Sequence, residues 1–178
     1  FDAITGLVTY SYEAWKLLPR SAADLSGGTG GGDPTDASVT DVQSGAVSGV
    51  VNLSGVVATT GMSANDEGFF VQDVGGGTWA GVYIYSSNAG TLTINAGDVL
   101  DITGEVTEYY ELTEVVVNSA DDVLVTGSGS VTATALSSAP SDWEDYEGVL
   151  VEISGLSLTS DADDYGECAT DWSSLYMD

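Results

Sequence analysis

The stretch "VLDITGEVTEYYELTEVVVNSADDV" (residues 99–123) decides the fold, because its alternating apolar residues predict two neighbouring strands, at 98–110 and 112–119. It also repeats the start of the chain, "FDAITGLVTYSYEAWKLLPRSAADL" (residues 1–25), without a gap at a spacing of 98. Ten of the 25 aligned positions are identical, and in the first copy they are Ile4, Thr5, Gly6, Val8, Thr9, Tyr12, Glu13, Ser21, Ala22 and Asp24. Both segments are therefore expected to form the same part of one domain type.

Three more strands are predicted upstream of this stretch. "SGAVSGVVNLSGVVATT" (44–60) indicates a long strand bent at its glycines, and "GFFVQD" (68–73) and "WAGVYIY" (79–85) flank a glycine turn. The chain contains 23 Gly and is rich in Val, Thr, Ser and Tyr, which favours an all-β protein. Five strands within residues 44–123 predict a small barrel or sandwich.

A second repeat lies near the other end of the chain. "VVNLSGVVATT" (50–60) returns as "LVEISGLSLTS" (150–160), and "WAGVYIY" returns as "WSSLYMD" (172–178). Residues 143–178 are therefore interpreted as the first half of a second domain, and residues 1–25 as its second half. The expected fold has two five-stranded barrels, one intact (44–123) and one split between the chain ends, with linkers at 26–43, which is glycine-rich, and 124–142.

Neither half can bury its apolar face or pair its strand edges alone. The halves can pair within one chain or between chains, or the ends can result from cleavage of a longer chain in an exposed loop. The glycine linker favours pairing between chains. The expected subunit interface then comprises Ile4, Gly6, Val8, Tyr10, Tyr12, Trp15, Lys16, Leu17, Leu18 and Arg20, facing Trp172, Leu175 and Tyr176 of the partner half. Alternatively, Lys16 and Arg20 lie on an exposed turn that leads to the linker and take no part in an interface.

Charge is the most uneven property of the sequence. There are 28 acidic residues, two basic residues and no His, which gives a formal net charge of −26. Such a chain repels phosphate backbones, so a nucleic-acid partner is not expected. No run of 18 apolar residues exists, so no membrane span is expected. The first residue is not Met, which indicates a processed product or an excerpt of a longer protein, and trypsin sites are confined to one end, which suits an extracellular or cell-surface location.

The stretches "GFFVQDVGGGTWAGVYIY" and "AGDVLDITGEVTEYYELTEV" resemble the OB-fold module that accompanies secreted nucleases of the endonuclease/exonuclease/phosphatase superfamily. The resemblance covers residues 44–123 and, more loosely, the split pair 143–178 with 1–25. It implies OB-like five-stranded barrels and an extracellular setting, and it brings no catalysis, because the nuclease domain is absent. The sequence departs from OB folds that hold single strands, since no basic residue lies between 21 and 178.

Two acidic loops are candidate calcium sites. "TSDADDYGECATDW" (159–172) and "GMSANDEGFF" (61–70) place several oxygen-bearing side chains beside a glycine, as calcium sites require. The candidate ligands are Asp161, Asp163, Asp164 and Glu167 in the first loop and Asn65, Asp66 and Glu67 in the second. The alternative is that both loops are simply solvated.

A possible ligand face lies on the predicted second and third strands. Its residues are Phe69, Phe70, Trp79, Tyr83 and Tyr85, which can form a stacking platform or, alternatively, fill the barrel core. An enzyme is not expected, because without His the common nucleophile triads are excluded.

These features together predict an extracellular structural protein that assembles with itself, head to tail, into a filament or surface array. The N-terminal segment of one copy would complete the split barrel of the next by strand complementation. The alternative is a secreted OB-fold binding module for a glycan or nucleic acid, cut from a larger extracellular nuclease-like protein.

Overall fold

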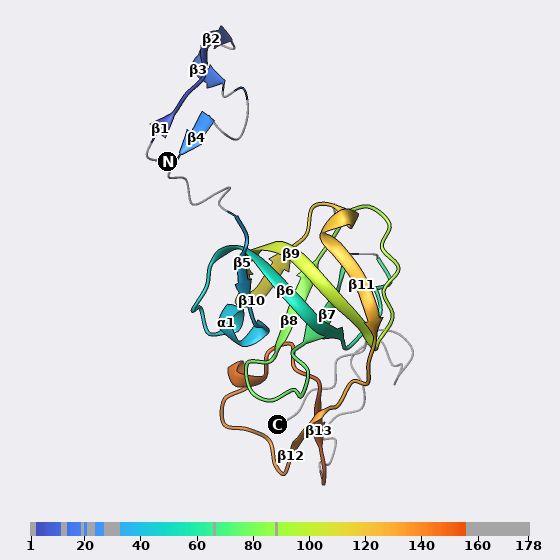
Figure 1. Cartoon of the computed structure of the whole chain (residues 1–178). Coiled ribbons are helices and arrows are strands. Elements are labelled where there is room, and N and C mark those ends of the chain that lie inside the picture. The colour runs from blue at the N-terminus through green and yellow to red at the C-terminus, as the bar shows by residue number, and fades with distance from the viewer. Residues whose placement is uncertain are drawn as a thin grey trace.

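The computed structural model describes residues 3–11, 14–18, 20, 24–26, 33–65, 67–87 and 89–155, and Figure 1 shows its elements. The protein is all-β, as predicted: thirteen strands, one short α-helix and short 3-10 turns make up the regular structure of these residues. Within them, no helix is long and apolar enough to cross a membrane.

Five strands in the middle of the chain pair in a closed cycle, which we call the barrel. Along the cycle, β6 pairs with β7, β7 with β8, β8 with β10, β10 with β9, and β9 returns to β6. All of these pairs are antiparallel except β8 with β10. The strands are β6 (Gly49–Ala58), β7 (Gly68–Gln72), β8 (Gly81–Tyr85), β9 (Asp98–Tyr109) and β10 (Leu112–Val116).

Two further strands extend the barrel along its longest members. β5 (Thr35–Ala37) lies parallel to β6, and β11 (Val123–Ser128) lies antiparallel to β9 after a short 3-10 turn, η2 (Ala120–Asp122). The register between β6 and β9 shifts at Gly55, which has a φ of 71° and donates its N–H to the Asp101 carboxylate at 2.8 Å. This bulge bends β6 where the sequence predicted a bend.

The predicted 26–43 linker is folded over its second half. Residues 35–43 form β5 and the helix α1 (Val39–Gln43). Ser38 caps the helix, since its Oγ accepts from the Asp41 N–H at 3.1 Å. The Asp41 carboxylate accepts from the Ser38 hydroxyl at 2.7 Å and from the Ser38 N–H at 3.0 Å, and these two bonds, the first most strongly, lower the pKa of Asp41. Val39 and Val42 are buried in the barrel core, so packing stabilises a helix too short to persist alone.

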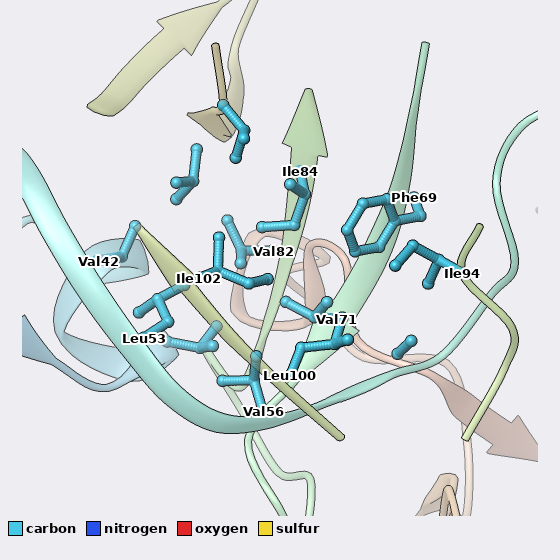
Figure 2. Close-up of a cluster of buried hydrophobic side chains, with 14 of the residues drawn as sticks. Val42, Leu53, Val56, Phe69, Val71, Val82, Ile84, Ile94, Leu100 and Ile102 are labelled. Atoms are coloured by element: carbon cyan, nitrogen blue, oxygen red, sulfur yellow. The ribbon is translucent and has the colours of Figure 1, made fainter. Parts of the chain in front are cut away.

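The core lies inside the barrel and follows the two-residue period of its strands (Figure 2). In β9, Leu100, Ile102 and Gly104 point inward. Gly104 is required there, because a Cβ would lie 2.5 Å from Cγ1 of Val115. Fully buried side chains that meet in this core include Val51, Leu53, Phe69, Val71, Val82, Ile84, Leu100 and Val115.

Residues 3–26, which we call the arm, copy the pairing of β9, β10 and β11. The arm strands β1 (Ala3–Ile4), β2 (Leu7–Ser11), β3 (Ala14–Leu18) and β4 (Leu25–Ser26) pair only among themselves in the described structure. All five β2–β3 pairs match β10–β9 pairs, and both β1–β4 pairs match β9–β11 pairs, when 98 is added to each residue number. Thus Val8–Leu17 corresponds to Val106–Val115, and Ile4–Leu25 corresponds to Ile102–Val123.

Residues 134–153, which we call the second unit, copy the start of the barrel domain. β12 (Thr134–Leu136) lies parallel to β13 (Val151–Ile153), with a 3-10 turn, η3 (Glu144–Tyr146), between them. The same parallel pairing joins β5 to β6, at spacings of 99 for the first strand and 100 for the second. The region predicted as a 124–142 linker therefore contains most of β11 and all of β12, because short edge strands carry too few residues for a clear sequence pattern.

The second unit is fixed against the barrel by backbone and polar contacts. The Trp79 N–H donates to the Asp145 carbonyl at 2.7 Å, and Gly81 packs directly against Gly148, with no space for a Cβ. The Glu147 carboxylate accepts from the Thr113 N–H at 2.9 Å and from Gln43 at 3.3 Å, although burial raises its pKa overall.

Replacing Leu100 by Ala should destabilise the barrel by about 2–5 kcal/mol, because the removed atoms leave a cavity in a packed core. Leu100 is 0% exposed, whereas Leu124, on the adjacent strand β11, is 60% exposed, so Leu124→Ala should change stability by under about 0.5 kcal/mol. Urea unfolding of both variants measures the difference. Equal losses in the two variants would contradict the described core.

Candidate functional site

An open groove of about 520 Å³ lies on the outer face of the barrel. It crosses the sheet from β7 to the turn between β9 and β10, where the parallel pair β8–β10 brings distant segments together. Its lining residues are Glu67, Phe70, Tyr83, Tyr85, Tyr109, Leu112 and Glu114. The groove therefore combines aromatic rings with carboxylates and contains no basic side chain.

Two rings form a corner in the floor of the groove. The centroids of Phe70 and Tyr83 lie 4.9 Å apart, with their planes tilted by 52°. The Tyr83 ring crosses the backbone of Gly68, where a Cβ would lie 2.5 Å from the phenol oxygen. Glycine at position 68 thus lets the ring lie close to the sheet and holds it in place.

Tyrosines also form one wall of the groove. Tyr109 and Tyr110 contact each other edge to face at 4.6 Å, at a tight turn in which Tyr110 and Glu111 both have positive φ. On β8, the Tyr85 hydroxyl accepts a hydrogen bond from the Ser87 hydroxyl at 2.6 Å. The tight turn thus places Tyr109 at one end of the groove, and a hydrogen bond holds the hydroxyl of Tyr85.

Glu114 is an unusual member of the groove because it is a buried acid. The residue is 6% exposed, and among the described residues no side chain or backbone group hydrogen-bonds to its carboxylate, whose oxygens are not among the fully enclosed unpartnered atoms and so open onto the groove. Burial raises the pKa of Glu114, and the nearby Glu108 raises it further. It lies opposite Tyr83 in the β8–β10 register, and the pKa of Tyr83 is raised by burial and then by Glu67, Glu114 and Tyr85.

The predicted ligand face is divided by the structure. Phe70, Tyr83 and Tyr85 line the groove, whereas Phe69 is in the core and Trp79 lies in the β7–β8 turn with a φ of 61°. Strand alternation explains the first difference, because adjacent residues on β7 face opposite sides. Sequence reasoning missed Tyr109, Leu112 and Glu114, and the only signal for Glu114 was a single acid within the apolar run 112–117.

A second candidate site is the apolar face of the arm. Ile4 is 43% exposed, whereas its counterpart Ile102 is 2% exposed; Leu17 is 44% exposed, whereas its counterpart Val115 is fully buried. Val8 shares this face by strand alternation, and beyond it the rings of Tyr10 and Trp15 pack at 5.0 Å. The arm thus exposes side chains whose counterparts form the barrel core.

The remaining predicted interface residues are placed as follows. Gly6 and Leu18 lie in the arm, Leu18 on its opposite face, while Tyr12, Trp172, Leu175 and Tyr176 are outside the described residues. Arg20 binds Asp24 within the arm through two side-chain hydrogen bonds of 2.6 and 3.0 Å, which raises the pKa of Arg20. Lys16 occupies the position that corresponds to Glu114 in the barrel.

The predicted calcium ligands lie mostly beyond the described structure. Asp66, Asp161, Asp163, Asp164 and Glu167 are outside the described residues. Ser63 organises the other loop: its hydroxyl donates to Asn65 at 2.9 Å and accepts from the Glu67 N–H at 2.9 Å. Among the residues with described positions, no group of three or more His, Cys, Asp or Glu side chains is arranged to hold a metal ion.

Comparisons with protein-family models, with curated proteins and with solved structures found no match for the chain. The proposals below therefore depend on the geometry of the arm, the second unit and the groove.

Replacing Glu114 by Gln should stabilise the protein at neutral pH and leave its stability unchanged at pH 3. Because the folded state has the raised pKa, it binds the Glu114 proton more tightly than the unfolded chain does. The stability from this residue is therefore present at low pH and is lost as the pH rises through the folded-state pKa. Thermal unfolding of both proteins from pH 3 to pH 8 measures the difference.

Exposed Glu105 on β9 is the matched position for this test. Glu105→Gln should not reproduce the pH-dependent gain, and Glu147, which also has a raised pKa, is unchanged in both variants. A Glu114→Gln protein that is less stable than the wild type at pH 7 would show that the carboxylate is stabilised in the groove.

Proposed function

We propose that this chain is an extracellular structural protein, without catalytic activity, that assembles head to tail through strand complementation of a split OB-like barrel. The arm of one copy completes a barrel that the second unit of another copy begins. One observation carries the proposal: the arm has the strand register of β9, β10 and β11, yet the side chains that would face a barrel core are exposed.

The strand arrangement supports an OB-like identity for the barrel. Five strands close into a small barrel, and the third and fifth strands, β8 and β10, form its one parallel pair. The groove lies on the second and third strands and beside the turn between the fourth and fifth, where OB folds place their ligands. Fold alone does not define function, so the arm supplies the functional argument.

The barrel itself specifies how the arm would pair with the second unit. In the barrel, β6 and β9 align Leu53 with Ile102 and Val51 with Gly104. Adding 100 to the first residue of each pair and subtracting 98 from the second gives the expected intermolecular pairs, Ile153 with Ile4 and Val151 with Gly6. Small Gly6 would then leave space for its neighbours, as Gly104 does in the barrel.

Pairing between copies is favoured over closure within one chain by distance. The start of β5 and the β12–β13 pair lie at opposite ends of the barrel (Figure 1). The eight residues that connect the arm to β5 span at most about 28 Å. The 12-residue strand β9 alone is about 40 Å long at about 3.3 Å per residue. The connection is therefore shorter than the barrel that it would have to pass, which favours pairing with another copy.

Burial of the arm would provide the driving force for assembly. Ile4, Val8 and Leu17 would leave water, and each such side chain contributes about 1.5–3 kcal/mol when fully buried. The gain is opposed by repulsion between copies that each carry a formal charge of −26, so we expect dissolved cations, calcium among them, to favour assembly. An extracellular location accords with basic residues confined to positions 16 and 20, since trypsin-like proteases have few sites.

A disulfide test follows from the proposed register. In the barrel, the Thr103 hydroxyl donates to the Asn52 amide oxygen at 2.8 Å, and the corresponding positions are Thr5 and Glu152. Mixing a Thr5→Cys copy with a Glu152→Cys copy, both also carrying Cys168→Ala, should give a cross-linked heterodimer on oxidation. Non-reducing electrophoresis with size-tagged copies measures its yield.

Thr9→Cys is the matched control, since its counterpart Thr107 lies beyond the β6–β9 ladder. It should cross-link to Glu152→Cys at least about tenfold less. Equal yields would refute the register. A doubly substituted chain that closes only on itself, at every concentration, would refute assembly between copies.

Leu17→Asp should keep the protein monomeric at concentrations where the wild type forms larger species, because a charge would occupy the buried joint. Leu7→Glu should not, because Leu7 lies on the other face of the arm, at the position of exposed Glu105. Sedimentation velocity over a concentration series compares the three proteins.

Salt and chelator distinguish the two roles of cations in the same measurement. Assembly that a calcium chelator abolishes at 0.5 M NaCl indicates a specific calcium site, whereas assembly that NaCl alone supports indicates screening. The proposal would be refuted if the wild-type protein were monomeric in every condition. It would also be refuted if the Leu17→Asp variant assembled as well as the wild type.

A further inference from the structure

We propose that the groove between β7 and the β9–β10 turn binds an organic cation of the substituted-ammonium class, with Glu114 as its counter-ion. The groove plays no part in the head-to-tail assembly, so the inference goes beyond the proposed function. The observation that motivates it is Glu114, a residue only 6% exposed that lines the groove, with no described group hydrogen-bonded to its carboxylate and with carboxylate oxygens that open onto the groove.

A carboxylate that is largely removed from water, with no protein group bonded to it, is costly, because desolvation disfavours its charged form. No basic side chain faces it: the titratable groups that line the groove with it are Glu67, Tyr83, Tyr85 and Tyr109, and Glu108 lies nearby. The raised pKa of Glu114 agrees with a site that lacks its positive charge. A cation in the groove would supply that charge and recover the lost interaction.

The aromatic rings select the kind of cation. Ring faces attract cations that carry apolar substituents and a weakly held hydration shell. Phe70 and Tyr83, tilted at 52°, form a concave corner, and Tyr109 and Tyr85 add two further rings to the lining. Calcium instead requires six to eight oxygen ligands, whereas this lining offers two carboxylates and three phenols among apolar rings.

The same lining rejects the common anionic ligands. A phosphate or a nucleic-acid strand would face Glu67 and Glu114 with no basic side chain to bind it. The volume of about 520 Å³ is sufficient for an alkylammonium head with an attached chain. Charge complementarity and ring arrangement thus point to one class of ligand.

The arm predicts one such site per chain. Lys16 stands where the barrel has Glu114, so a barrel completed by the arm would place an ammonium group in the corresponding groove. That groove would repel the ligand. A stoichiometry of one per chain therefore separates this site from general attraction to an acidic protein.

Calorimetric titration of the full-length chain with choline, at 150 mM NaCl and pH 7.5, tests the proposal. The titration is carried out on the Leu17→Asp variant, so that heat of assembly does not contribute to the measured heat. Choline binding can then be measured whether or not the wild-type protein assembles. We expect saturable binding of one choline per chain. The neutral isostere 3,3-dimethylbutan-1-ol should bind at least about tenfold more weakly, because it has the same shape without the charge.

Variants of the groove assign the binding to its residues. Glu114→Gln should weaken choline binding at least about tenfold, whereas Glu105→Gln, on the exposed face of β9, should leave it unchanged. Tyr83→Phe keeps a ring and should bind, whereas Tyr83→Leu should not. Circular dichroism establishes that each variant is folded.

Three results would overturn the inference. They are the absence of saturable choline binding, equal affinity for the neutral isostere, and a Glu114→Gln variant that binds as the wild type does. A choline affinity that falls with added NaCl only as far as the ionic strength explains, with no difference between variants, would likewise show general charge attraction rather than a site.

Discussion

The ladder between β6 and β9 is the contact on which the rest of the structure depends. Eight residue pairs join these strands and close the cycle, and β5 and β11 then extend its outer sides. Inward side chains of both strands, such as Leu53 and Leu100, meet in the core that this closure creates. In the described arm, the strands that copy β9 have no such ladder, which is why Ile4 and Val8 remain exposed.

Much of the fold followed from the sequence because its signals are local. Two-residue alternation placed β7, β8 and β9 within two residues of their observed limits, and the glycine at position 55 marked the bulge in β6. The repeat at a spacing of 98 also predicts that residues 1–25 and 99–123 fold alike. Identical side-chain patterns give identical registers, because a slip of one residue would turn every apolar side chain outward.

The parts that could not be predicted depend on tertiary contacts. The sequence pattern places β5 and α1 in a linker, because their few residues are held by the Ser38 cap and by burial of Val39 rather than by a repeating pattern. The groove was only partly predicted, because the parallel pairing of β8 with β10 brings Glu114 beside Tyr83 from far along the chain. Neither closure of the barrel nor the burial of one acid is encoded in a short stretch of sequence.

The close packing of Gly81 against Gly148 has a mechanical consequence. Two backbones in direct contact, joined also by Glu147 to Thr113, resist twisting and bending in a way that a flexible tether does not. The barrel therefore sets the orientation of the second unit. Repetition of a fixed rotation and translation generates a screw, so any series of such units would have a defined pitch and stiffness rather than the form of beads on a string.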